Sequence, residues 1–210
     1  MTEPMYTSSI VETGKPCTMS IIRGSAVDLV CPFPPDQLSL VYAWTHAYSE
    51  LTENDDSPAT IELYEALMGL TFSTCTSYGM RRAGTADELI GVLYCEPAGP
   101  RNGYLHIAMS RRVWGRGWTE EAVSLCIRDL FERYPEFTRL SAAMLERNRM
   151  AQSLASRMGF TLEATLADMV LQRGAPRSVV HFGLTRRDWE RSCSENSTKE
   201  RGGSYGSSNQ

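Results

Sequence analysis

One segment of the chain combines residue types that could bind a charged reactant. Residues 110–122 read SRRVWGRGWTEEA, in which two glycines precede a pattern typical of a helix. Glycine lets the backbone approach a ligand closely, and the first N–H groups of a helix favour anions. Four arginines and no acidic residue lie between positions 101 and 117, although the net charge of the chain is −4. The pattern predicts a docking site for a polyanionic small molecule.

The glycine pair also has a second interpretation, because short turns between a strand and a helix use glycine for geometric reasons. The segment lacks the Gly-Lys-Ser/Thr ending of a Walker loop, and it does not match the GxGxxG fingerprint of dinucleotide-binding proteins. Gly115 and Gly117 alone therefore do not decide between a simple turn and a binding loop.

The composition is that of a globular protein without a direct nucleic-acid partner. Apolar residues make up 42% of the 210 residues and charged residues 22%, which excludes a wholly disordered chain. The 25 acidic residues outnumber the 21 basic ones, whereas a generic nucleic-acid binder carries a basic excess. We find no apolar run of membrane-spanning length and expect no membrane association. The six cysteines form no CxxC pair, so we expect reduced thiols, no metal site and a cytoplasmic location.

Alternating apolar patterns predict one folded domain over residues 18–190, preceded by a flexible segment at 1–17 and followed by a disordered tail at 191–210. One predicted helix begins near residue 36, and three further helices cover residues 60–70, 119–134 and 148–158. The predicted strands cover 20–31, 77–82, 88–95, 104–110, 140–145, 160–171 and 178–184. The resulting order, β-α-α-β-β-β-α-β-α-β-β, is that of an α+β fold in which a mixed sheet carries helices.

Two motifs in this order resemble the GNAT acetyltransferase superfamily, particularly its branch of ribosomal-protein N-terminal acetyltransferases. Residues 114–122, WGRGWTEEA, are similar to the loop that binds the pyrophosphate of acetyl-CoA. The helix that opens at Asn148 and closes with Gly159-Phe160 is similar to a helix of that branch. Shorter matches extend the resemblance over about Met19 to Trp189. It implies a single α+β domain with a mixed, mostly antiparallel sheet flanked by helices.

The same resemblance implies that acetyl-CoA binds as a co-substrate. The superfamily signature can be placed so that it ends at Gly117 or at Thr119, and we prefer the second register because phosphate binding needs the N–H groups of the first helical turn. The strand backbone would hold the pantetheine arm at Ile107, Ala108 and Met109, with Asn148 close to it. The pyrophosphate would lie on Trp114, Gly115, Arg116, Gly117, Trp118 and Thr119.

The residues that would transfer protons depart from the pattern of the branch. The usual acid is a Ser three positions after the helix-opening Asn, or in relatives a Tyr seven positions after it, and these positions hold Ala151 and Ala155. Ser153 should face elsewhere on the helix. His106 is the side chain best suited to accept a proton near neutral pH, although a strand histidine can also be a packed residue. Tyr104 and Tyr94 are further polar candidates for catalysis.

The resemblance implies an acetyl-CoA-dependent N-acetyltransferase that moves the acetyl group directly onto an amine, either a protein N-terminus or a small molecule. Related enzymes contact substrate after the first helix, where the acidic residues 50–56 could favour a cationic acceptor or could simply be solvated. A second hypothesis is a non-catalytic acyl-CoA-binding or interaction module, which kept the loop and lost the chemistry at Ala151 and Ala155. We expect either a monomer or a homodimer.

Overall fold

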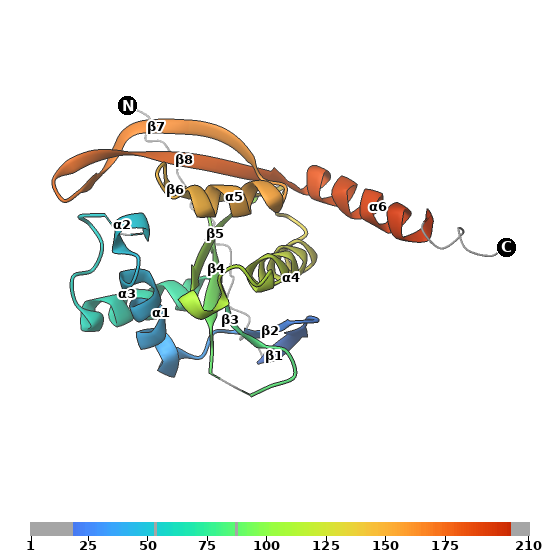
Figure 1. Cartoon of the computed structure of the whole chain (residues 1–210), viewed down its shortest axis with the longest axis horizontal. Coiled ribbons are helices and arrows are strands. Elements are labelled where there is room, and N and C mark those ends of the chain that lie inside the picture. The colour runs from blue at the N-terminus through green and yellow to red at the C-terminus, as the bar shows by residue number, and fades with distance from the viewer. Residues whose placement is uncertain (1–18, 53, 87, 203–210) are drawn as a thin grey trace, which may run out of the picture.

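Eight strands form one mixed sheet, in the order β1-β2-β3-β4-β5-β6-β8-β7, in the computed structural model, which describes residues 19–52, 54–86 and 88–202 (Figure 1). Neighbouring strands are antiparallel except β5 and β6, which are parallel. This confirms the predicted α+β class with its mostly antiparallel sheet. The strands are β1 (Ser20–Arg23), β2 (Val27–Cys31), β3 (Thr76–Arg82), β4 (Gly91–Pro97), β5 (Asn102–Met109), β6 (Arg139–Leu145), β7 (Thr161–Gln172) and β8 (Ala175–Thr185).

Helices cover both faces of the central strands. Helices α1 and α3 share one cluster of buried residues with β4, whereas α4 shares a second cluster with β2 to β6 on the opposite face. Figure 1 shows α1 and α3 on one side of β4 and β5, and α4 on the other. The helices are α1 (Leu38–His46), α2 (Ser49–Thr52), α3 (Ile61–Thr74), α4 (Trp118–Arg133), α5 (Arg149–Arg157) and α6 (Arg186–Gly202), with 3-10 turns at Pro35–Gln37 and Arg111–Val113.

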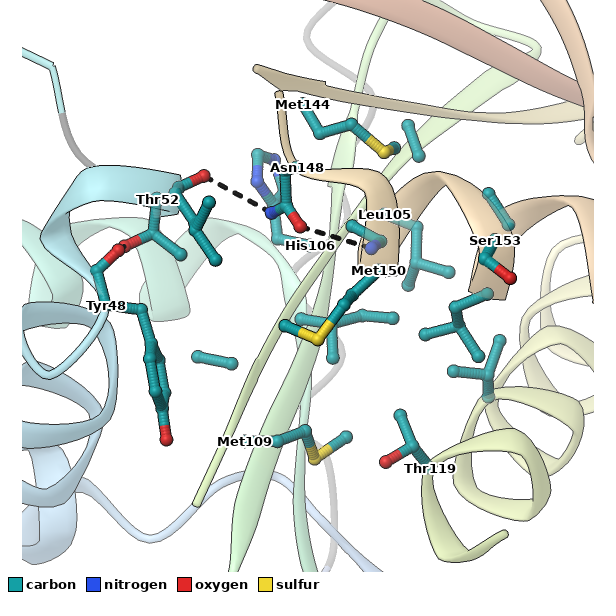
Figure 2. Close-up of a pocket in the computed structure, with 18 of the residues that line it drawn as sticks. Tyr48, Thr52, Leu105, His106, Met109, Thr119, Met144, Asn148, Met150 and Ser153 are labelled. Atoms are coloured by element: carbon teal, nitrogen blue, oxygen red, sulfur yellow. Dashed lines mark hydrogen bonds between the residues drawn. The ribbon is translucent and has the colours of Figure 1, made fainter. Parts of the chain in front are cut away.

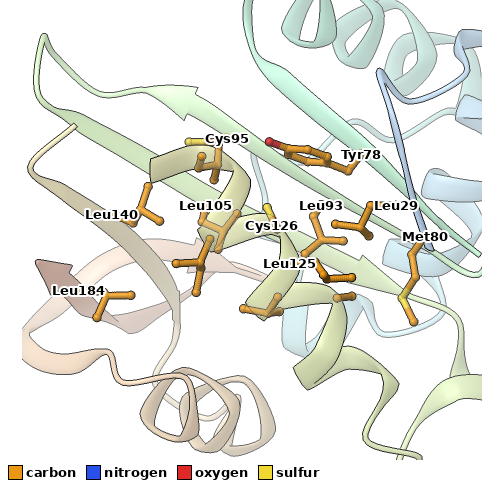
Figure 3. Packing of buried hydrophobic residues seen from close by; sticks show 14 of the residues in the cluster. Leu29, Tyr78, Met80, Leu93, Cys95, Leu105, Leu125, Cys126, Leu140 and Leu184 are labelled. Atoms are coloured by element: carbon orange, nitrogen blue, oxygen red, sulfur yellow. The ribbon is translucent and has the colours of Figure 1, made fainter. Parts of the chain in front are cut away.

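Helix α4 places an unbroken apolar stripe against the sheet, as the spacing of its residues predicts. Its buried residues are Ala122, Val123, Leu125, Cys126, Ile127, Leu130 and Phe131. They pack on strand residues such as Leu29, Tyr78 and Leu93, all completely buried (Figure 3). Burial of each large apolar side chain contributes about 1.5–3 kcal/mol. This packing fixes the N-terminal end of α4 beside the end of β5.

The strand predicted over residues 20–31 is instead the hairpin of β1 and β2, with its turn at Gly24. A Cβ atom at Gly24 would lie 2.6 Å from Glu121 Oε1 of α4, so the turn is closely packed against that helix. The Glu121 carboxylate accepts hydrogen bonds from the Ser25 hydroxyl (2.8 Å) and the Ala26 N–H (3.0 Å). The turn therefore depends on a contact between residues about 95 positions apart, which a local pattern does not reveal. The predicted flexible segment at 1–17 lies outside the described residues.

The prediction of a disordered tail at 191–210 is wrong for residues 191–202, because helix α6 continues through them. The predicted domain boundary at residue 190 therefore falls inside this helix. Trp189 packs on Phe131 of α4, with ring centroids 5.0 Å apart, and Arg191 donates to the Asp188 carboxylate (2.9 Å). These contacts anchor the first turn of α6, from which the helix can extend by propagation without a new nucleation step. Residues 203–210 lie outside the described part of the chain.

Arg186, at the start of α6, holds the C-terminal end of α4. Its guanidinium donates to the carbonyl oxygens of Phe131 (2.9 Å), Tyr134 (2.8 Å) and Phe137 (2.8 Å). A cation is favoured at a helix C-terminus, where carbonyl groups lack partners within the helix. We expect Arg186→Met to lower the free energy of unfolding by about 3 kcal/mol, because the three carbonyls lose their donor. Urea unfolding measures the change.

The exposed neighbour Arg187 supplies the matched control for this substitution. Arg187→Met should alter the free energy of unfolding by less than about 0.5 kcal/mol. Equal losses for the two variants would show that the three hydrogen bonds of Arg186 do not stabilise the fold.

Candidate functional site

The candidate site lies where β5 and β6 separate. The two parallel strands pair only from Asn102 to Tyr104 on β5, opposite Arg139 to Ser141 on β6. Beyond Tyr104, β5 stays paired with β4 as far as Met109, while β6 stays paired with β8 as far as Leu145. Within the described residues, the edge of β5 that faces β6 is therefore open after Tyr104. An open strand edge offers its N–H and C=O groups to a ligand.

A cavity of about 680 Å³ fills this opening (Figure 2). Residues 105–109 of β5 and 142–145 of β6 line it, together with side chains of α1, α4 and α5. Along β5, Leu105, Ile107 and Met109 pack in the cluster that contains α4, whereas Ala108 packs in the cluster of α1 and α3. Because side chains alternate along a strand, His106 shares the face of Ala108. The cavity therefore connects the two faces of the sheet.

The glycine-rich turn between β5 and α4 has the geometry of an anion-binding loop. Gly115 and Gly117 adopt φ angles of 70° and 73°, which favour glycine, and a Cβ atom at either would meet no other atom within 4 Å. Gly117 is the N-cap residue of α4 and has no side chain that could accept a hydrogen bond. The first N–H groups of the helix therefore have no capping acceptor and can donate to a ligand. Trp114, Gly115 and Thr119 line the cavity. A pyrophosphate group fits the open space and these donors.

An aromatic stack joins this turn to the helices on the far side of the cavity. The Arg111 guanidinium lies 4.7 Å from the centroid of the Tyr48 ring, and the rings of Tyr48 and Trp114 are 4.6 Å apart. Tyr48 lies between α1 and α2, and both rings line the cavity. The stack therefore closes the side of the cavity that lies between α1 and the glycine-rich turn.

Asn148 is the N-cap of α5 and also contacts α2. Its Oδ1 accepts from the Ala151 N–H (3.1 Å) and its Nδ2 donates to the Leu51 carbonyl (3.2 Å), both drawn in Figure 2. Ala151 and Ala155 line the cavity without a hydroxyl group. Ser153, expected to face elsewhere, also lines it, because the cavity extends along α5 and reaches more than one side of this helix.

His106 combines stacking with an unsatisfied ring nitrogen. Its ring stacks on Tyr94, with centroids 4.5 Å apart and planes 4° apart. The Nε2 atom is buried, has no hydrogen-bond partner among the described residues and lies 3.8 Å from the Glu96 carboxylate. Burial lowers the pKa of His106 to about 4, so the imidazole is neutral at pH 7. Burial raises the pKa of Glu96 above its usual value.

The two tyrosines predicted as catalytic differ in their positions. Tyr94 lines the cavity, and burial raises its pKa well above that of a free phenol, so its hydroxyl keeps its proton. Tyr104 lies at the base of the opening, with its ring centroid 5.2 Å from that of His106, and is outside the cavity lining. Only Tyr94 and His106, of the three predicted catalytic residues, can therefore touch a ligand in the cavity.

Comparison of the sequence with protein families assigns the domain. Residues 35–161, more than half of the chain, match the family described as "Acetyltransferase (GNAT) domain". The chain belongs to the GNAT acetyltransferase family. The match ends at the first residue of β7. It therefore covers β3 to β6, the glycine-rich turn and all of α5, which forms one wall of the cavity. A comparison with curated proteins returned no significant match.

Solved structures with the same GNAT fold include a RimL ribosomal L7/L12 alpha-N-protein acetyltransferase in complex with coenzyme A. It is 15% identical, with a TM-score of 0.67, and the alignment covers 79% of this chain and 98% of that one. A probable GNAT-family acetyltransferase from Chromobacterium violaceum is 20% identical, with a TM-score of 0.68 and coverage of 90% and 100%. The spermidine/spermine N-acetyltransferase SpeG from Vibrio cholerae is 13% identical, with a TM-score of 0.66 and coverage of 81% and 99%.

The remaining residues predicted to bind acetyl-CoA in this GNAT domain fall into two groups. Arg116, Gly117 and Trp118 lie in the turn next to the cavity without lining it, and the Arg116 guanidinium lies 5.2 Å from the centroid of the Trp118 ring. The others line the cavity: Ile107, Ala108, Met109, Trp114, Gly115, Thr119 and Asn148. Sequence reasoning missed Tyr48 and Tyr64 as cavity residues, because helical spacing alone does not separate core rings from cavity rings.

Two of the acidic residues at 50–56, Glu50 and Asp55, contact the β7–β8 hairpin. The Asp55 carboxylate accepts hydrogen bonds from the N–H groups of Arg173 (2.5 Å) and Gly174 (2.8 Å) at the tip of the β7–β8 hairpin. The Arg173 guanidinium lies 3.6 Å from the Glu50 carboxylate, and Gln172 donates to the Glu50 carbonyl (3.1 Å). These contacts fasten the loop and α2 to the hairpin.

The described residues contain no group of three or more His, Cys, Asp and Glu side chains that could hold a metal ion. None of the helices in this part of the chain combines the length and the hydropathy that crossing a bilayer requires.

Proposed function

We propose that this GNAT acetyltransferase is an acetyl-CoA-dependent N-acetyltransferase that moves the acetyl group directly onto a primary amine. The observation that carries the proposal is one continuous cavity that reaches from the glycine-rich turn, through the opening between β5 and β6, to His106 on the other face of the sheet. Such a cavity can admit a thioester from one face and an amine from the other. Holding two reactants together supplies much of the rate of such a transfer.

Acetyl-CoA would enter on the face of α4. The N–H groups at the start of this helix and the guanidinium of Arg116 would hold the pyrophosphate, and the open edge of β5 from Ile107 to Met109 would hold the pantetheine arm. The carbonyl carbon would then lie in the opening beside His106. A backbone N–H of the same strand edge could stabilise the oxyanion of the tetrahedral intermediate.

His106 would accept the proton of the attacking nitrogen. With the proton of the neutral ring on Nε2, opposite the Glu96 carboxylate at 3.8 Å, the lone pair is on Nδ1. An imidazole whose pKa is about 4 is a weak base toward a free ammonium ion. It can accept a proton as the C–N bond forms, because the nitrogen then becomes strongly acidic, and Glu96 would stabilise the resulting imidazolium.

Breakdown of the intermediate needs no further donor. The C–S bond breaks as the amide forms, and the proton taken from nitrogen returns to the departing thiolate, which balances atoms and charge. This route is compatible with alanine at positions 151 and 155. We further propose a cytoplasmic location, which is consistent with buried cysteines outside any disulfide, such as Cys95 and Cys126.

Release of the CoA thiol distinguishes an enzyme from a non-catalytic acyl-CoA-binding module. We expect the protein, acetyl-CoA and a mixed panel of amines and short peptides to generate free thiol well above the background without protein. Mass spectrometry of the product should show a gain of one acetyl group on the amine. Binding of acetyl-CoA by calorimetry without thiol release from any acceptor would instead support the module.

A further inference from the structure

We infer that the acceptor carries an aromatic or branched aliphatic group next to its amine and no second positive charge. This inference rests on the proposed N-acetyltransferase function and narrows its substrate class. It follows from the lining of the cavity on the face of α1 and α3, which we term the acceptor compartment: Trp44, Tyr48, Leu51, Tyr64, Tyr94 and His106.

The acceptor compartment is walled by rings. Tyr94 and His106 stack in parallel on the sheet, and Tyr64 of α3 meets Tyr42 edge to face at 5.3 Å. Trp44 is almost fully buried in the cluster of α1 and α3. Aromatic walls favour a flat or branched apolar group by area burial and by ring-to-ring contacts. They also attract one ammonium group, such as the amine that reacts.

The only carboxylate among the described lining residues is Glu120 of α4, on the opposite face of the sheet, and it accepts from the Arg157 guanidinium of α5 (2.7 Å). The remaining charged lining residue, Arg149 at the start of α5, is a cation and would repel a second ammonium group. Glu96, the carboxylate near His106, is not part of the cavity lining. Among the described residues, the acceptor compartment thus offers no carboxylate to a second ammonium group.

The threonine hydroxyls of this region already donate to the backbone. Thr45 donates to the carbonyl oxygens of Val41 (3.0 Å) and Tyr42 (3.1 Å). Thr52 donates to the carbonyl oxygens of Thr45 (2.9 Å) and Tyr48 (3.0 Å). These bonds stabilise α1 and α2. Each hydroxyl oxygen keeps acceptor lone pairs, but it is neutral and supplies no negative charge to an ammonium group.

Two carboxylates of the acidic segment after α1 already have partners. The Asp55 carboxylate accepts from backbone N–H groups of the hairpin tip, and Glu50 lies beside the Arg173 guanidinium. None of the described acidic residues of this segment lines the cavity. A second ammonium group in the acceptor compartment would therefore lose its hydration without gaining a counter-ion. Such uncompensated burial is strongly unfavourable. The geometry disfavours a polyamine and favours an amine with an apolar substituent.

Steady-state kinetics with matched acceptors tests this inference. We expect kcat/KM for 2-phenylethylamine to exceed that for spermidine by at least about a hundredfold, because the second charge is not compensated. The peptide Phe-Gly-Gly amide tests whether the apolar group can belong to a protein N-terminus, with Lys-Gly-Gly amide as its charged counterpart. Preference for the phenyl member within either pair supports the inference and identifies the source. Equal or faster turnover of both charged members would overturn it.

Variants at Tyr64 test whether the compartment is the cause. Tyr64→Ala should lower kcat/KM for 2-phenylethylamine about tenfold and that for methylamine by a clearly smaller factor, because methylamine has no apolar group to lose the ring contact. Tyr64→Phe, which retains the ring, should keep the preference. Equal loss with every amine would reveal a structural role only and would count against the inference. Absence of thiol release from any acceptor in the panel would instead defeat the proposed function itself.

Discussion

His106→Phe is expected to lower kcat at least about a hundredfold, because phenylalanine keeps the stack on Tyr94 but cannot accept a proton. The affinity for acetyl-CoA should change little, since the start of α4 and the backbone edge of β5, and not the His106 side chain, would bind the pyrophosphate and the pantetheine arm. Pre-steady-state thiol release measures the chemical step, and calorimetry measures the affinity. A kcat within twofold of that of the wild-type protein would show that His106 does not accept the proton.

Tyr104→Phe provides the matched control for His106. Tyr104 lies on the same strand and the same face, with its ring 5.2 Å from that of His106, but outside the cavity lining. We expect its turnover to remain within about twofold of the unchanged protein. A comparable loss in both variants would indicate that the strand itself had shifted.

The pH dependence follows from the lowered pKa of His106. The ring is neutral above about pH 5, so kcat/KM should rise with pH only as the acceptor amine loses its proton. Between pH 6.5 and 4 the unfolded state binds more protons at this position than the folded state, so the contribution to stability is present above pH 6.5 and is lost as the pH falls toward 4. In His106→Phe this loss should disappear from the pH dependence of the free energy of unfolding.

Gly117→Val is expected to raise the Kd for acetyl-CoA by more than tenfold. Gly117 adopts a φ of 73°, a conformation that costs a residue with a Cβ atom about 1–2 kcal/mol and a β-branched residue such as valine more. The added side chain would also occupy the open space beside the first turn of α4. Loss of the loop geometry removes the aligned N–H donors. Calorimetric titration with acetyl-CoA measures the effect.

Gly84→Val carries the same strain elsewhere. Gly84 has a φ of 70° in the turn after β3, and its Cβ position is also open. This variant should lose similar stability while retaining the affinity for acetyl-CoA. A Kd for Gly117→Val that equals that of Gly84→Val would contradict the assignment of the turn to the pyrophosphate.

The sequence predicted those parts of the fold that rest on local patterns. The apolar stripe of α4 has a helical period, so its buried face could be identified before any neighbour was known. The hairpin at Gly24 and the helix of residues 191–202 escaped prediction, because Glu121 stabilises the first and Trp189 anchors the second through contacts distant in sequence. Local propensity carries no information about such partners.

The sequence by itself indicated the turn that we propose for the pyrophosphate, since Gly115, Gly117 and the surrounding arginines would act through backbone conformation and local charge. Only the tertiary structure decided where the cavity opens, because the pairing of β5 with β6 ends at Tyr104 and this register depends on strands that lie far apart in the chain. It also brought His106 beside Tyr94 and Glu96, and it bound Asp55 to the hairpin tip. The arginine-rich turn is the basis of our proposal for the ligand on one face, whereas the rings and charges gathered by the fold are the basis of our proposal for the amine on the other.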